Sequence, residues 1–142
     1  MPTAPGLGLE INATPVRPAE IAKLATIRAT ADDLKQIEET VMAQESELES
    51  GELSRKLDFE FHRRIAAAAH NSVMSITADA VNQSIREPVL RSKRTESMRK
   101  RVVKFHRDIF EAIRSGNADH AKQVMNSHIV DVQCHIERTE NE

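Results

Sequence analysis

The stretch DFEFHRRIAAAAHN, residues 58–71, decides how this sequence is interpreted. Phe61 and Ile65 are four residues apart, the spacing that places apolar side chains on one face of an α-helix. Asp58 and His62 share this spacing, so the helix also directs a carboxylate and an imidazole toward its apolar side. A buried carboxylate needs a compensating partner, because leaving it unpaired costs free energy or shifts its pKa. The stretch therefore predicts a helix that carries a polar site beside its core.

The composition of the whole chain favours helices. The 142 residues include four Phe, four Gly and five Pro but no Trp or Tyr, which disfavours a turn-rich β fold. The net charge of −2 gives no overall attraction to nucleic acid or to a membrane surface. The single Cys134 excludes an internal disulfide and suits a reducing cytoplasm, where we expect the protein to act. No apolar run is long enough to span a membrane, and the N-terminus lacks a secretion signal.

We predict an all-α fold, an antiparallel bundle of about six helices. Residues 1–17 hold most of the prolines and little periodicity, which indicates a tail or linker, and residues 18–142 form the predicted domain. Helix starts are expected at Pro18, Thr30, Leu53, Asn71 or Ser72, Thr95 and Asn117. Expected ends are Gly51, Ala69, a stop or kink near Pro88, Gly116 and about Arg138. In the helix after Asn71, we expect Val73, Ile76, Ala80, Val81 and Ile85 to face inward.

Two further helices each place a histidine within an apolar stripe. His106 falls among Val102, Ile109 and Phe110, and His128 falls between Met125 and Val132. A single buried histidine is usually structural, but three imidazoles and one carboxylate together form a good ligand set for a divalent transition metal. We therefore predict a metal site, and the affinity order of divalent ions favours zinc or nickel. The predicted ligands are Asp58, His62, His106 and His128.

The other polar features have more ordinary interpretations. His70, His120 and His135 are expected at the surface. Eight acidic residues and one basic residue lie within 32–52, and seven basic residues and one acidic residue lie within 91–104. Both runs suit solvated helix faces, although the basic run also suits an anion site for a small acid or an acidic surface.

Three segments resemble the FCD domain, the ligand-binding half of FadR-type regulators in the GntR superfamily. DFEFHRRIAAAAHNSVM resembles that family's pattern D-x-x-F-H-x-x-[IL]-x-x-A-x-x-N. FHRDIFEAIRSGNADHAKQVMNSHI resembles its later segment H-x-x-I-x-x-A-[IL]-x-x-G-[DN]-x-x-x-A-x-x-x-M-x-x-H. IAKLATIRATADDLKQIEE fits its opening helices. The resemblance covers about residues 18 to 136.

This resemblance implies a helical sensor domain that holds a divalent metal, binds a small carboxylate effector and forms homodimers. By position, the family's metal ligands fall on Asp58, His62, His106 and His128. The family also implies a winged helix-turn-helix for DNA binding, but only 17 residues precede the first FCD-like helix, so this chain alone is not expected to bind DNA. The family's first helix often contains the pattern Glu-x-Arg. The corresponding residues here are Glu10, Ile11 and Asn12, so asparagine stands in place of the arginine.

Three functions are compatible with these observations. The first is an effector sensor, in which a small mono- or dicarboxylate or hydroxy acid binds the metal and is also held by Arg86, Arg91 or Asn82. The second is a metal-dependent enzyme with two histidines and one carboxylate. The sequence offers no spare inward-facing general base and no Ser or Cys nucleophile with a partner, so we expect no enzymatic activity. The third is a structural dimerisation module stabilised by a metal.

Overall fold

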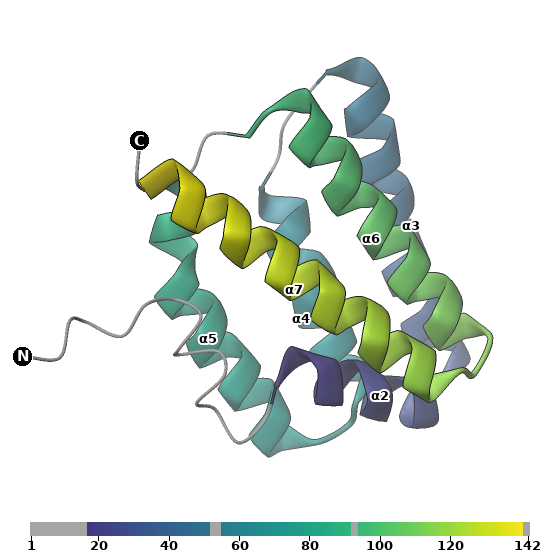
Figure 1. Ribbon diagram of the computed structural model, residues 1–142. Coiled ribbons are helices and arrows are strands. Elements are labelled where there is room, and N and C mark those ends of the chain that lie inside the picture. The colour runs from purple at the N-terminus through teal and green to yellow at the C-terminus, as the bar shows by residue number, and fades with distance from the viewer. Residues whose placement is uncertain (1–16, 52–54, 92–93, 141–142) are drawn as a thin grey trace, which may run out of the picture.

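The structure is a computed structural model, and it describes residues 17–51, 55–91 and 94–140. These residues form six helices and no strand, which confirms the predicted all-α fold. The helices are α2 (Pro18–Arg28), α3 (Ala31–Ser50), α4 (Lys56–Ala68), α5 (Ser72–Arg91), α6 (Glu96–Arg114) and α7 (Ala118–Glu140). Figure 1 shows α7 in front of α4 and α6 in front of α3, with the short α2 crossing the base of the bundle.

Local capping explains most of the helix boundaries. Thr30 and Asp33 form a reciprocal capping box at the start of α3, and Gly51 ends this helix in the left-handed conformation with φ of 79°. The Thr95 hydroxyl accepts a hydrogen bond from the Met98 amide at the start of α6. The Asn117 side chain accepts from the His120 amide (3.2 Å) at the start of α7. These four ends were predicted from the sequence because each depends on neighbours within a few residues.

The remaining boundaries differ slightly from the prediction. α4 begins at Lys56, and the predicted start at Leu53 lies outside the described residues. α5 continues to Arg91, three residues beyond Pro88. The predicted tail, 1–17, lies outside the described residues except for Arg17.

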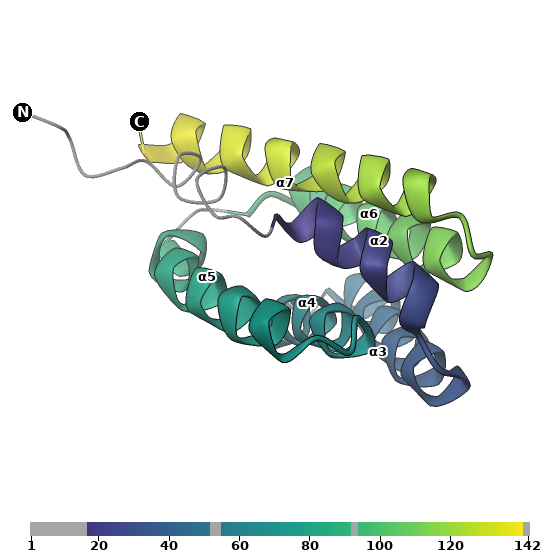
Figure 2. The same ribbon diagram turned by 90° about the horizontal axis from the view of Figure 1, so that it is seen from below.

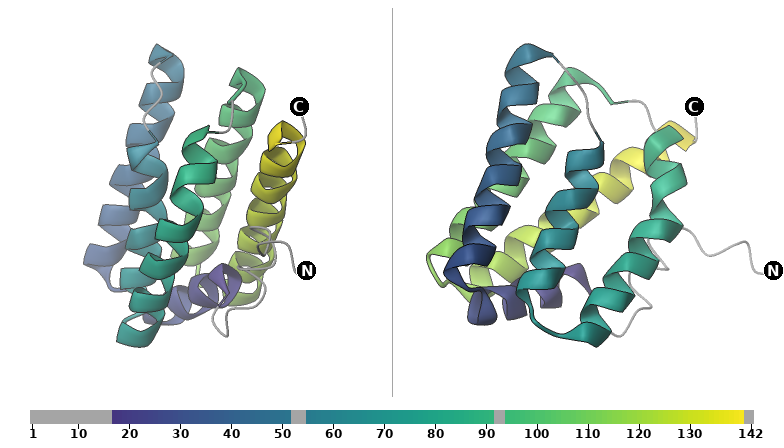
Figure 3. Two further views of the ribbon diagram at one scale, coloured as in Figure 1. Left: turned by 90° about the vertical axis from the view of Figure 1, so that its left-hand side faces the viewer. Right: turned by 180° about the vertical axis from the view of Figure 1, so that it is seen from behind.

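The helices form two layers, with α6 and α7 in one and α3, α4 and α5 in the other (Figure 2). The views in Figure 3 show α3, α4 and α5 running side by side. A single apolar core joins α2, α3, α4, α6 and α7, and its largest fully buried side chains include Phe61, Phe110, Ile37, Ile65 and Ile109.

α5 lies at the edge of this arrangement and packs chiefly against α4. The prediction that Val73 and Ile76 face inward is wrong, because their exposed fractions are 65% and 69%. Ala80 is also exposed, whereas Val81 is half-buried and the side chain of Ile85 lies outside the described residues. A helix with one packing partner buries only a narrow face, so apolar spacing alone does not show which of its residues are covered. Within the described residues, no helix combines the length and apolar character that crossing a bilayer requires.

Candidate metal centre

Three helices bring His62, His106 and His128 together inside the bundle. Nε2 of His106 lies 3.1 Å from Nε2 of His128, which lies 3.4 Å from Nε2 of His62. One nitrogen from each residue falls within 4.8 Å of the other two. His106 and His128 are buried, and His62 is half-buried. The His62 and His128 rings are parallel, and the His106 ring is perpendicular to both.

The spacing of these nitrogens suits a bound transition metal. Two nitrogens held at about 2.0–2.1 Å from one ion lie about 2.9–3.4 Å apart in octahedral or tetrahedral coordination. The His106–His128 and His128–His62 separations, 3.1 and 3.4 Å, fall in this range. In addition, Nδ1 of His128 is buried with no hydrogen-bond partner in the described part of the chain. The donor set and the spacing of these two pairs therefore fit a divalent cation.

Burial keeps the three imidazoles neutral. It lowers the pKa of His62 to about 4. It also lowers the pKa values of His106 and His128 well below the usual range, and the neighbouring histidines and Arg94 lower them further. A neutral imidazole is the form that binds a metal, so the cluster is ready for coordination at neutral pH.

Gln44 on α3 fixes the orientation of His106. Its side-chain amide donates to Oδ1 of Asp58 at 2.6 Å, and its Oε1 lies 2.8 Å from Nδ1 of His106. Because a carboxylate can only accept, the NH₂ group of Gln44 must face Asp58 and its carbonyl must face His106. His106 then carries its hydrogen on Nδ1, which leaves the lone pair of Nε2 pointing at the other histidines.

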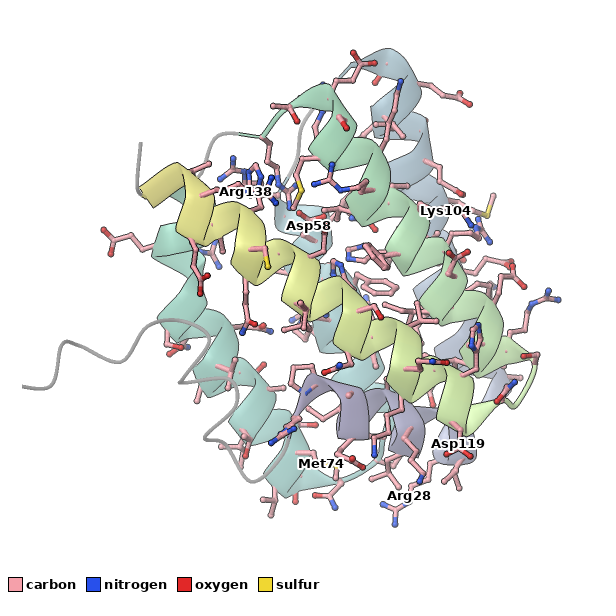
Figure 4. All side chains as sticks on the ribbon, viewed as in Figure 1. Arg28, Asp58, Met74, Lys104, Asp119 and Arg138 are labelled. Carbon is pink, nitrogen blue, oxygen red and sulfur yellow. The ribbon has the colours of Figure 1, made fainter. Side chains whose placement is uncertain are left out.

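Asp58 lies one turn before His62 on α4, and its carboxylate is directed to other partners. It forms an ion pair with Arg94, and both side chains are largely buried. Burial raises the pKa of Asp58, and the positive charge of Arg94 opposes that shift. Figure 4 shows Asp58 inside the bundle, whereas Lys104 and Asp119 lie at its periphery. The structure thus brings together three of the four predicted ligands, and the fourth is held beside them by Gln44 and Arg94.

A small cavity adjoins the three histidines. Its volume is ≈ 50 Å³, and Asp58, Asn82, Arg94 and Val132 are among the residues that line it. Asn82, a predicted effector contact, is therefore one of the residues that line this cavity. Arg86 instead lines a neighbouring pocket of ≈ 460 Å³ between α4 and α5, where its guanidinium lies 5.0 Å from the centroid of the Phe59 ring. The side chain of Arg91 lies outside the described residues.

Two residues of the site were missed in the sequence, and both left a signal there. Gln44 follows Ile37 and Val41 at helical spacing, so a polar residue occupied the apolar stripe of α3. Arg94 belongs to the basic run 91–104, for which an anion site was one interpretation. Three histidines were predicted at the surface. His70 and His120 are exposed, and His135 is half-buried.

Comparisons with known proteins show which proteins this chain is similar to. Residues 19–131 match the FCD domain family. The HTH-type transcriptional regulator LutR of Bacillus subtilis (strain 168) is 29% identical over 120 residues, which make up 80% of this chain and 54% of that protein. The solved structure of Streptococcus agalactiae GntR matches with a TM-score of 0.72 and 30% identity over 89% of this chain and 56% of that one. The chain spans about half the length of these two relatives. With six helices in its described residues and a match to the family over most of its length, this chain belongs to the FCD domain family.

Proposed function

We propose that this chain is the effector-sensing domain of a GntR-type transcription regulator. A divalent metal, zinc or nickel, is held by His62, His106 and His128, with Asp58 as a fourth ligand. When bound, the metal supplies a positive charge that attracts the oxygens of a small organic acid. The observation that carries this proposal is the convergence of three neutral imidazoles, two of them buried and one half-buried, with nitrogen separations of 3.1 and 3.4 Å.

A small carboxylate is the effector class that the surroundings favour. Three neutral histidines and one carboxylate leave a dication with a net charge of about +1, so an anion gains charge neutralisation in a poorly solvated site. Asn82 lines the cavity, which supports its proposed role as a donor to such a ligand. Arg86 and Arg91 are proposed contacts for a larger acid that extends toward the pocket between α4 and α5.

The wider setting of the domain follows from its family. We propose that it acts in the cytoplasm as a homodimer, and that DNA contact depends on a winged helix-turn-helix outside the residues of this chain. The relative LutR, about half of whose length this chain covers, is named an HTH-type transcriptional regulator, which supports this setting.

A thermal-shift screen of organic acids tests the proposed function. The purified chain is compared in its metal-loaded form and after EDTA treatment, with metal content measured in both. We expect about one zinc or nickel per chain and acid-induced stabilisation only in the loaded form. Equal shifts in both forms would make the metal purely structural, and a chain that takes up no zinc or nickel would exclude the proposal.

A further inference from the structure

Asp58, the proposed fourth metal ligand, is already paired with Arg94, a positively charged residue beside the same site. Asp58 already has two partners, because Gln44 donates to its Oδ1 and Arg94 forms an ion pair with its carboxylate. Arg94 nevertheless lines the same small cavity as the three histidines. Its side chain is only 13% exposed, so it has little access to water as an alternative partner.

The charges of the buried groups show why this pairing matters. Asp58 and Arg94 cancel each other, and the three imidazoles are neutral, so these five groups together have no net charge before any ligand binds. Arg94 is close enough for its positive charge to lower the pKa values of His106 and His128, so it also repels a cation held by them. If Asp58 turned toward such a cation, Arg94 would be left as a buried charge without a partner, which is strongly unfavourable.

We propose that Arg94 exchanges Asp58 for the carboxylate of the effector, so that metal and effector bind cooperatively. This inference rests on the proposed function and concerns its regulation. Without the acid, Arg94 holds Asp58 and opposes the cation. With the acid, Arg94 pairs with the acid's carboxylate, and Asp58 is released to serve the metal.

Thermodynamic linkage makes this exchange measurable. If the acid strengthens metal binding through Arg94, the metal must strengthen acid binding by the same factor. Zn²⁺ is titrated into the chain by competition with a chromophoric chelator, without acid and with acetate or glycolate as probes. The variants are Arg94→Gln and a matched control, Arg101→Gln, which removes a half-exposed arginine of the same basic run that pairs with Asp131 instead.

The wild type and Arg101→Gln should bind zinc at least about five-fold more tightly when one of the acids is present. Arg94→Gln should bind zinc alone more tightly than the wild type, because it removes a repelling charge and frees Asp58. Its zinc affinity should then change by less than about two-fold on adding acid. The absorption spectrum of the Co²⁺-loaded wild type should change with acid, and that of Arg94→Gln should not.

The inference is overturned if Arg94→Gln responds to acid as strongly as the wild type, or if neither acid changes the zinc affinity of the wild type. A wild type that binds no zinc would instead exclude the proposed function itself. These failures are distinguishable, because zinc binding without acid is measured first.

A second variant keeps the test valid if Arg94→Gln does not fold. Asp58→Asn preserves the shape of the side chain but leaves Arg94 without its anion. In zinc-free protein, acetate should therefore raise the melting temperature of Asp58→Asn more than that of the wild type. The double variant Asp58→Asn/Arg94→Gln should lose this extra response. An acetate response of Asp58→Asn no larger than that of the wild type would contradict the exchange.

Discussion

Two neighbouring regions of the bundle are built by the same helices and have opposite character. The apolar core contains only aliphatic and aromatic side chains at its centre, including Ile37, Val41, Ile65, Ile109, Phe110 and Ile113. The polar centre consists of Gln44, Asp58, His62, Arg94, His106 and His128. Helices α3, α4, α6 and α7 contribute to both regions, and on each helix a residue of the polar centre lies within one turn of a core residue.

The two regions differ in whether their own side chains satisfy all of their buried groups. The apolar core needs nothing beyond its own side chains, since its stability comes from area removed from water. The polar centre directs three imidazole nitrogens at one point and leaves Nδ1 of His128 without a partner among the described residues. Buried polar groups in proteins normally have hydrogen-bond partners. A region where one lacks a partner is therefore a place where a functional site is expected.

The largest expected effect comes from Phe61, where the two regions meet. Its ring is fully buried and stacks on His106 with centroids 3.9 Å apart. Phe61→Ala should lower the free energy of unfolding by about 3–5 kcal/mol and also weaken zinc binding, because His106 loses the surface that orients it. Ile37→Ala, a control within the apolar core, should cost about 2–5 kcal/mol and leave zinc affinity unchanged. Urea denaturation and zinc titration measure both, and unchanged zinc affinity in Phe61→Ala would show that the regions are independent.

Acid should act selectively on the polar centre of the metal-free protein. In the unfolded chain His62 takes up a proton near pH 6.5, whereas in the folded chain it does so only near pH 4. The unfolded state therefore binds more protons between these values, and stability falls as the pH is lowered through that window. The shift of His62 corresponds to about 3 kcal/mol, and His106 and His128 act in the same direction.

Urea denaturation at a series of pH values checks this expectation. His62→Gln should make the dependence between pH 6.5 and 4 less steep, because one of the three buried-site histidines that take up a proton on unfolding is gone. His120→Gln, which changes an exposed histidine, should keep the wild-type profile. Identical slopes in the wild type and His62→Gln would mean that His62 is not held neutral by the fold.

Zinc should stabilise the fold through the polar centre alone. At a free zinc concentration 100 times the dissociation constant, mass action adds about 2.7 kcal/mol to the free energy of unfolding. His128→Ala should abolish this gain, whereas His120→Ala on the same helix should retain it, because that residue lies at the exposed start of α7. Thermal melts with zinc and with EDTA measure the difference. A zinc-induced shift that survives in His128→Ala would place the ion elsewhere.

The sequence predicted the two regions to different extents. The helices and most of the core followed from periodicity and caps, which depend on residues close together in the chain. The grouping of His62, His106 and His128 followed from the position of each on an apolar stripe. The ion pair of Asp58 with Arg94 and the bridge through Gln44 were not predicted, because they join residues 36 and 14 positions apart and depend on how helices meet. The exposure of Val73 and Ile76 was missed for the same reason, since α5 has only one main packing partner.

The smallest expected effect separates local capping from the metal site. The Thr30 hydroxyl accepts a hydrogen bond from the Asp33 amide at the start of α3. Gln44 lies toward the other end of this helix. Thr30→Ala should therefore lower the free energy of unfolding by about 1 kcal/mol, the usual cost of losing such a cap. The stabilisation by zinc should remain that of the wild type, because the cap contacts no residue of the polar centre. Thermal melts of Thr30→Ala with and without zinc provide the measurement. A reduced zinc-induced shift would mean that fraying at the start of α3 reaches Gln44, and the two regions would then act as one cooperative unit.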